Sequence, residues 1–393
     1  MTSDQARRME DIPASSIRRV FEEVNVLQAQ GRKVIPLHIG QPDFDTPEHI
    51  KAAAKQALDG GLTGYTSNRG LPQLRQALAE KLRRENGLTV DPDKQIIVTV
   101  GANEAILMAT MAFVNPGDEV LVLSPTWLHY FYCVRMAGGI PVEVPLRASN
   151  NFLIDPDDIR RRITNRTRML IVNTPHNPTG AVYPYAVLKE IAQIVEQHGL
   201  LLLSDEIYEK LIYGEAEHVS LAGFDNIADR TLTINGFSKA YAMTGWRLGY
   251  IISSPEHSST LLRVHQYTTV CATSFAQAGA VAALIGSQEP LQSMVTEFDR
   301  RREALINAFA EMPGCTLVAP QGAFYAFPSI PPGRSSEAVA FDLLQQAGVA
   351  VVPGSAFGES GEGYLRIAYS CTLSDIHQGM TAMKTYFSQI TAR

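Results

Sequence analysis

Two cations lie eight positions apart in the segment NGFSKAYAMTGWRLGY, residues 235–250. Lys239 and Arg247 are the only charged residues of this segment, and their neighbours are small, hydroxylated or aromatic. A lysine in a dry, partly apolar pocket has a lowered pKa, so its neutral amine can attack a carbonyl carbon. A guanidinium can hold a phosphate through two hydrogen bonds, which an ammonium cannot do. The segment therefore predicts a lysine nucleophile and, with Ser238 and Arg247, a phosphate contact.

A second phosphate contact is predicted where a strand over residues 96–100 gives way to a helix over residues 103–113. The turn between them is Gly101-Ala102-Asn103. Backbone N–H groups at the start of a helix are unpaired and lie at the positive end of the helix dipole, so they bind anions. An ordinary strand-to-helix turn would explain the same residues, so this prediction depends on the residues that accompany it.

Two further predicted strands, 169–172 and 200–204, are followed by residues that could face a ligand ring. Asp205 comes directly after a run of leucines, where a carboxylate is costly to bury unless a cation meets it. Tyr208 follows it, and Asn177 lies in the turn NTPHNPTG, where its amide can both donate and accept. A helix cap at Asp205 and a plain loop at Asn177 are the alternatives.

Together these residues describe one ligand that has a phosphate, a ring cation, a polar ring oxygen and an aldehyde. Pyridoxal 5′-phosphate carries all four groups, and its enzymes use a lysine Schiff base with an acidic partner at the ring nitrogen. The sequence contains no GxGxxG, GxxxxGK[ST], HExxH or GxSxG motif. We therefore expect pyridoxal 5′-phosphate as the cofactor and no metal.

The elements that must position these residues alternate along the middle of the chain. Short apolar runs are typical of buried strands and longer amphipathic runs of helices, which predicts an α/β fold with a mostly parallel sheet sandwiched by helices. The predicted strands span residues 96–100, 119–123, 140–144, 169–172, 200–204, 231–235 and 248–252. Parallel strands bring their carboxyl ends to one edge of the sheet, and ligands bind at that edge.

The last third of the chain has a different pattern, with helices predicted over residues 292–311, 337–347 and 374–389 around short strands. We expect a large cofactor-binding α/β domain over residues 46–285. A smaller α+β domain would be built from residues 1–45 and 286–393. A chain of 393 residues is long for one hydrophobic core, which favours two domains.

Composition argues against several other classes of protein. The net charge is −6 and no long basic run occurs, so we expect no nucleic-acid partner. No apolar run has the length of a membrane span, so we expect no membrane association. The four cysteines lie far apart and the N-terminal stretch MTSDQARRMED is polar, which is typical of a cytoplasmic protein with reduced thiols.

The chain resembles the fold-type-I pyridoxal-phosphate aminotransferases of class I/II, in the branch that holds many bacterial aspartate and aromatic aminotransferases. The resemblance covers nearly the whole chain. Its motifs are HIGQPDFDTPEHI, GYTSNRGLPQLR, PGDEVLVLSPTW, NTPHNPTG, SDEIYEKL, GFSKAYAMTGWRLGY, GAFYAF and GVAVVPGSAFG. It implies a ping-pong transfer of an amino group between an L-amino acid and a 2-oxo acid, through a Schiff base at Lys239.

The resemblance also implies a role for each site residue. The catalytic residues would be Lys239, Asp205 at the ring nitrogen and Tyr208 at the ring oxygen. The other cofactor contacts would be Ala102, Asn103, Trp127, Asn177, Ser238 and Arg247, with Tyr65 reaching the phosphate of the neighbouring subunit in a homodimer. The substrate contacts would be Gly40, Trp127, Asn177 and Arg366.

One position departs from the family pattern. Many relatives carry serine three residues before the lysine, where this chain has Gly236. Phosphate binding would then depend more on Ser238, Arg247 and the helix that follows Ala102.

Other reactions and the choice of substrate stay open. β-Lyases, cyclases and oxidases share this fold and these cofactor residues, and an effector-binding regulator is a more distant alternative. Arg18 or Arg69 could receive an acidic substrate side chain, or could lie at the surface or in a subunit contact. Tyr130 and Phe131 could favour an aromatic substrate, or could belong to the core.

Overall fold

A computed structural model describes residues 4, 6–10, 12–14 and 16–391 of the chain. Part of the polar N-terminal stretch therefore lies outside the described residues. In the described part, no helix combines the length and the apolar character needed to cross a membrane.

A seven-stranded sheet occupies the middle of the chain, and it contains all seven strands that the sequence predicts. Its spatial order is β2-β8-β7-β6-β5-β3-β4. The strands are β2 (Ile96–Thr99), β3 (Glu119–Ser124), β4 (Ile140–Pro145), β5 (Thr167–Asn173), β6 (Leu201–Asp205), β7 (Thr231–Gly236) and β8 (Gly249–Ile252). Only β8 runs antiparallel to its neighbours β2 and β7, while the remaining pairs are parallel. The start of β8 therefore lies at the edge where β7 ends, which brings Arg247 to the same edge as Lys239.

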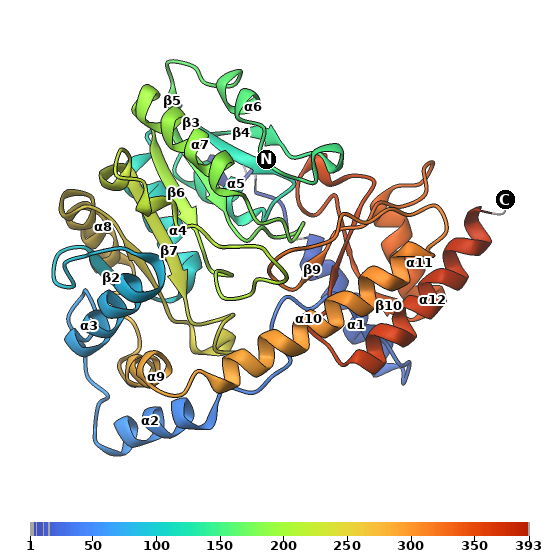
Figure 1. The fold of residues 1–393 in the computed structure, drawn as a ribbon, viewed down its shortest axis with the longest axis horizontal. Coiled ribbons are helices and arrows are strands. Elements are labelled where there is room, and N and C mark those ends of the chain that lie inside the picture. The colour runs from blue at the N-terminus through green and yellow to red at the C-terminus, as the bar shows by residue number, and fades with distance from the viewer. Residues whose placement is uncertain (1–3, 5, 11, 15, 392–393) are drawn as a thin grey trace.

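Helices cover both faces of this sheet because its strands are apolar on both sides. Leu170 and Val172 of β5 pack into the core that contains residues of α7 (Tyr185–His198). Met169 and Ile171 point the other way and pack with residues of α4 (Gly101–Phe113) and α5 (His129–Met136). The expected helices of this region are present, and Figure 1 shows them around the sheet.

Several helices were not among those predicted. They are α1 (Ser16–Ala29), α2 (Glu48–Asp59), α3 (Pro72–Lys81), α8 (Pro255–Thr268) and α9 (Ser274–Ile285). Helix α9 reads SFAQAGAVAALI and is apolar on almost every side, so it lacks the periodicity that marks an amphipathic helix. It packs against α2 at the lower end of the molecule in Figure 1.

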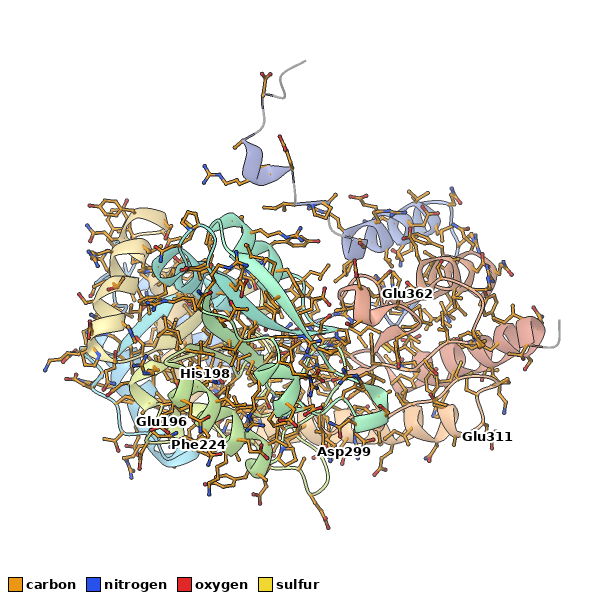
Figure 2. All side chains as sticks on the ribbon, turned by 90° about the horizontal axis from the view of Figure 1, so that it is seen from above. Glu196, His198, Phe224, Asp299, Glu311 and Glu362 are labelled. Atoms are coloured by element: carbon orange, nitrogen blue, oxygen red, sulfur yellow. The ribbon has the colours of Figure 1, made fainter. Side chains whose placement is uncertain are left out.

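The C-terminal third forms a second body beside the large sheet. Strands β9 (Tyr325–Ala326), β11 (Val352–Pro353) and β12 (Leu365–Ala368) make an antiparallel sheet in the order β11-β12-β9. The long helices α10 (Glu289–Ala310), α11 (Ser336–Ala347) and α12 (Leu373–Thr391) accompany it. Figure 2 places Glu311, just after α10, at the opposite end of the molecule from Glu196 and His198 of α7.

The N-terminal segment joins this second body. Strand β1 (Ile35–Pro36) pairs in parallel with β10 (Val349–Ala350). Val20, Val24 and Leu27 of α1 form a small core with Leu344 and Ala350. The pairing agrees with a smaller domain made from both ends of the chain, while the boundaries at residues 46 and 285 stay a prediction.

Candidate active site

A cavity of about 430 Å³ opens at the carboxyl edge of the large sheet. Every site residue predicted above lines it, except Tyr65. The large sheet supplies residues that follow β2, β3, β5, β6 and β7, and the second body supplies Tyr325 and Arg366. The N-terminal segment closes the remaining side with Ile17, Phe21, Ile39, Gly40 and Gln41. The expectation that a ligand binds at the carboxyl edge of the parallel strands therefore located the cavity. It could not predict the cavity residues that come from the two ends of the chain.

Lys239 projects into the cavity from a tight turn between β7 and β8. Ala242 and Arg247 of this turn adopt the left-handed backbone conformation, with φ of 51° and 52°. The Lys239 Nζ donates to the carbonyl oxygen of Gly40 at 2.6 Å and lies 5.8 Å from the ring centre of Tyr208. Burial, helped by the charges of Arg366 and Arg247, lowers the pKa of Lys239 to about 7. A neutral amine is therefore accessible near neutral pH.

Asp205 ends β6, and its buried side chain lines the cavity. Its carboxylate accepts from the Tyr130 hydroxyl at 2.7 Å and from the Ile207 backbone N–H at 3.1 Å. Burial raises the pKa of Asp205 to about 6, although the hydrogen bond from Tyr130 acts in the opposite direction. A cationic ring nitrogen beside this buried carboxylate would favour the ionised form of Asp205.

Tyr130 was missed as a partner of Asp205. It belongs to α5, a helix predicted only by its apolar pattern. The sequence could not show which strand end this helix reaches, because that depends on the spatial order of the strands. Phe131, the next residue, lies in the core between α5 and the sheet and does not line the cavity.

Arg247 lies against the start of α4. Gly101 has a φ of +78°, and a Cβ placed on it would come within 2.7 Å of the Arg247 Nη2. Only glycine therefore lets the guanidinium approach this helix N-terminus so closely. Ala102, Asn103 and Ser238 line the cavity at the same end, so backbone N–H groups, a hydroxyl and a cation converge where an anion would bind.

Gly236 lies where a side chain such as the serine of many relatives would be tightly packed. A Cβ at this position would lie 3.0 Å from both the Leu248 carbonyl oxygen and the Gly249 Cα of the adjacent strand. The contact to a phosphate is therefore left to the groups around Ser238 and Arg247.

Arg366 is the cation that the second body contributes to the cavity. It lies on β12, is 3 % exposed and donates through Nη2 to the His38 carbonyl oxygen at 2.9 Å. Its guanidinium lies 4.6 Å from the ring centre of Tyr325 and 5.0 Å from that of Phe357. Its Nε is buried without a hydrogen-bond partner. A fixed, incompletely paired guanidinium is suited to a carboxylate ligand.

Asn177 and Tyr208 also line the cavity. The Asn177 Oδ1 is buried without a partner, while the backbone N–H of Asn177 donates to Asn173 Oδ1 at 2.9 Å. The hydroxyls of Tyr208 and Tyr325 are hydrogen-bonded at 3.0 Å. Trp127 also lines the cavity and offers an aromatic face to a flat ligand.

The residues present fit the cofactor predicted from the sequence. Three cations line the cavity among the described residues, namely Lys239, Arg247 and Arg366, and Asp205 is the one carboxylate. A ligand that carries a phosphate, a ring cation and an aldehyde would meet Arg247, Asp205 and Lys239 respectively. The buried and unpaired polar atoms of Asn177 and Arg366 then have a ligand to satisfy them.

Three other residues of interest lie outside the cavity of this chain. Tyr65 is 88 % exposed, so it does not contact the site of its own subunit. Arg69 donates to the Ser258 hydroxyl at 2.7 Å, and neither Arg18 nor Arg69 lines the cavity.

Comparisons with known proteins give matches over almost the whole chain. The family model described as aminotransferase class I and II matches residues 32–383. The chain is 44 % identical to the aspartate aminotransferase of Pyrococcus abyssi and 43 % identical to aromatic-amino-acid aminotransferase 2 of Thermococcus litoralis, with 96 % of each chain covered in both cases. The crystal structure of the aromatic aminotransferase from Pyrococcus horikoshii superposes with a TM-score of 0.90 at 43 % identity, covering 94 % of this chain and 99 % of the other.

Proposed function

Because the chain belongs to the class I and II aminotransferases, a family of pyridoxal-phosphate-dependent transaminases, we propose that the cavity described above is its catalytic site. The predicted family, fold, cofactor and reaction class are thereby confirmed. The observation that carries the proposal is that one cavity is lined by the buried Lys239 amine, the Asp205 carboxylate and the guanidinium groups of Arg247 and Arg366.

The proposed roles follow from where each group lies. When bound, pyridoxal 5′-phosphate supplies an aldehyde that captures the substrate amine and a ring that takes up the electrons released at Cα. Lys239 would hold the cofactor aldehyde, and its Nζ would be the group that takes and returns the substrate Cα proton. Asp205 accepts a hydrogen bond from the ring N–H and keeps that nitrogen protonated. Tyr208 and Asn177 hold the ring oxygen.

The remaining contacts orient the two ligands. Trp127 stacks on the ring, and the phosphate is held by Ala102, Asn103, Ser238 and Arg247. Arg366 holds the substrate α-carboxylate with help from Asn177 and the backbone at Gly40. An amino acid and then a 2-oxo acid use this one cavity in turn, which is a ping-pong reaction.

We also propose a homodimer with shared sites. Tyr65 and Tyr267 are 88 % and 86 % exposed, which is unusual for large aromatic side chains. Asn68 donates to the Val270 carbonyl oxygen at 2.7 Å and ties their two segments together. An interface over this surface would cover both rings and bring Tyr65 to the phosphate of the neighbouring subunit.

The domain division and the cellular location are proposals of the same kind. The β1–β10 pairing supports a small domain made of residues 1–45 and 286–393 around a large domain at 46–285. The four cysteines are all unpaired, which is expected in the reducing cytoplasm.

The preferred substrate is proposed to be an aromatic or other apolar L-amino acid rather than aspartate. Each cation that lines the cavity already has a ligand group: Arg247 the phosphate, Lys239 the aldehyde and Arg366 the α-carboxylate. The wall formed by the N-terminal segment contributes Ile17, Phe21 and Ile39, which bind an apolar side chain better than a second carboxylate.

Initial rates with L-phenylalanine and with L-aspartate, each paired with 2-oxoglutarate, test this assignment. We expect kcat/KM for phenylalanine to exceed that for aspartate by at least about tenfold, since an unpaired buried carboxylate costs 1.4 kcal/mol or more. Arg18→Gln and Arg69→Gln should leave the ratio unchanged, because neither residue lines the cavity. An aspartate activity that matches that of phenylalanine and is lost in either variant would contradict it.

A further inference from the structure

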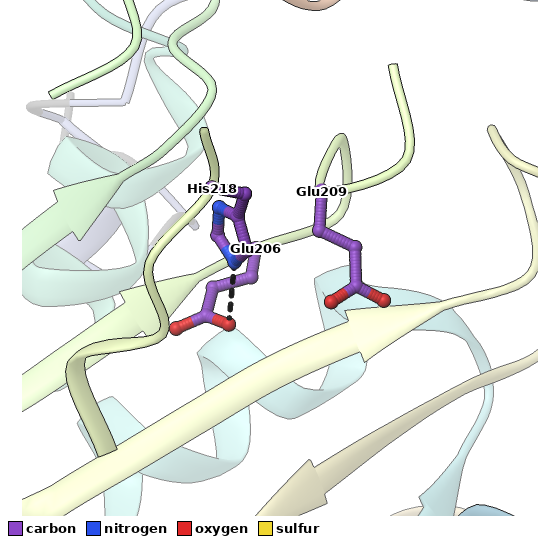
Figure 3. Close-up of side chains that lie close together, drawn as sticks. All are labelled: Glu206, Glu209 and His218. Carbon is purple, nitrogen blue, oxygen red and sulfur yellow. Dashed lines mark hydrogen bonds and ion pairs between the residues drawn. The ribbon is translucent and has the colours of Figure 1, made fainter. Parts of the chain in front are cut away.

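The turn that carries Asp205 and Tyr208 has a second, charged side that the proposed mechanism does not use. Asp205 and Tyr208 line the cavity. Glu206 and Glu209, their neighbours in sequence, do not line it, and they are buried behind it. Figure 3 shows Glu206 facing His218, with Glu209 beside them. The two glutamates and His218 offer ligand atoms that all lie within 4.8 Å of one another.

Glu206 is fully satisfied by hydrogen bonds and is 1 % exposed. Its Oε1 accepts from the Ser204 hydroxyl at 2.8 Å, the Ser220 hydroxyl at 3.0 Å and the Leu221 backbone N–H at 3.3 Å. Its Oε2 accepts from His218 Nε2 at 3.0 Å. Only His218 among these donors can bring a positive charge to Glu206.

Glu209 already has an internal cation. Lys81 Nζ donates to Glu209 Oε1, and Asn86 Nδ2 donates to Oε2 at 2.8 Å. The carboxylate of Glu209 is therefore already neutralised by an ammonium, and that of Glu206 is hydrogen-bonded to His218, so we interpret the cluster without a metal. The cluster is instead an ion network whose net charge depends on His218.

The charge of this network affects the pKa of Asp205 in the cavity. The negative charge of Glu206 is one of the causes that raise the pKa of Asp205. Burial alone would lower the pKa of His218, but the hydrogen bond and charge of Glu206, with the charge of Glu209, outweigh burial and raise that pKa. Lys81 opposes this change. A protonated His218 gives the network two cations for its two carboxylates.

We propose that His218 is a positioning residue for the cofactor site, which acts through Glu206. It anchors the turn that carries Asp205 and Tyr208, and its charge offsets the carboxylate that directly follows Asp205. The inference rests on the proposed role of Asp205 at the ring nitrogen. Without this offset, the uncompensated negative charge would favour the protonated form of every titrating group in the cavity.

The test is a pH titration of the visible absorption of the bound cofactor, made on the holoenzyme without substrate. His218→Gln keeps a neutral donor near Nε2 but removes the charge. We expect it to raise the midpoint of the titration by about 1 pH unit, because the loss of a nearby positive charge in a protein interior favours the protonated form of the titrating group. Glu206→Gln with His218→Gln removes both charges and should return the midpoint to that of the wild type.

Ser220→Ala is the matched control, because it removes one hydrogen bond to Glu206 and no charge. Its midpoint should equal that of the wild type. An unchanged midpoint in His218→Gln, or an equal shift in Ser220→Ala, overturns the inference and leaves the proposed function intact. His218→Gln could fail to fold, in which case the double variant Glu206→Gln with His218→Gln provides the test. If the midpoint of the double variant differs from that of the wild type by the shift predicted for His218→Gln, the inference is overturned. A wild type that cannot bind the cofactor overturns the proposed function as well.

Discussion

Lys239 and Asp205 are ionisable groups whose pKa values burial moves toward neutrality from opposite directions. The pKa of the amine falls to about 7 and that of the carboxyl rises to about 6. Both groups could be predicted from their places after strands, because strand ends converge at one edge. The pKa values could not be predicted, since they depend mainly on how deeply each group is buried, and also on Arg366 and Tyr130, which come from distant parts of the sequence.

Lys239→Ala should abolish transamination. In the proposed mechanism the lysine both holds the cofactor aldehyde and moves the Cα proton, and general acid–base help alone contributes about 10²–10⁴-fold in rate. Steady-state assays should show a loss of at least about 10³-fold with little change in thermal unfolding. Lys94→Ala, at an exposed residue paired only with Asp91, is the control and should keep full activity. Activity within tenfold of the wild type would contradict the role of Lys239.

The buried amine also predicts a pH dependence of stability in the cofactor-free protein. The pKa of Lys239 is about 7 when folded and 10.5 in its ordinary state, so the unfolded chain binds the extra proton between these values. The free energy of unfolding therefore rises with pH across this window. Denaturant unfolding of the wild type and Lys239→Met should differ by an amount that grows by up to about 2 kcal/mol from pH 7 to pH 9. A difference that stays constant with pH would contradict the lowered pKa of the Lys239 amine.

At the scale of elements, the reversed strand β8 brings the site together. Its start lies beside the end of β7, so seven residues of chain can join Lys239 to Arg247 across a single edge. Seven strands and their approximate limits could be predicted from apolar runs. The apolar helix α9 could not, because it has no polar face, and Tyr325 could not be placed, because β9 belongs to a different sheet.

Gly236→Ser tests how closely β7 and β8 approach. A side chain there would press against the Leu248 carbonyl and the Gly249 Cα, so we expect a loss of about 1–3 kcal/mol in the free energy of unfolding. Ser238→Ala is the matched comparison and should weaken cofactor binding with little change in stability. Thermal and denaturant unfolding of the cofactor-free variants would separate these effects. A fully stable Gly236→Ser protein would mean that the strands can separate at this point.

At the scale of the whole molecule, the N-terminal and C-terminal segments complete a site that begins on the large sheet. Gly40 accepts from Lys239, and Arg366 donates to His38, so both ends of the chain contact the catalytic residues. The motifs around Gly40 and Arg366 pointed to these residues only through the family resemblance. The positions of the strand ends could not predict Gly40 and Arg366 as site residues, because both lie outside the large sheet.

Shared sites predict that two defective subunits can complement each other. Lys239→Ala inactivates the site of its own chain, whereas Tyr65→Ala would weaken phosphate binding in the site of its neighbour. A mixed dimer then contains one site with both defects and one intact site. Mixing dissociated subunits at low cofactor concentration should restore activity that neither variant has alone. A failure to restore it, in a mixture shown to form mixed dimers, would contradict the proposed role of Tyr65.

The visible absorption spectrum of the purified protein, recorded before and after adding one amino acid without an oxo acid, tests the central claim most directly. We predict a yellow band from the cofactor held by Lys239, which bleaches as the amino group is transferred and bleaches fastest with an aromatic amino acid. A colourless protein that added pyridoxal 5′-phosphate cannot restore, or a yellow band that no amino acid bleaches, would contradict the assignment of this cavity as a transaminase site.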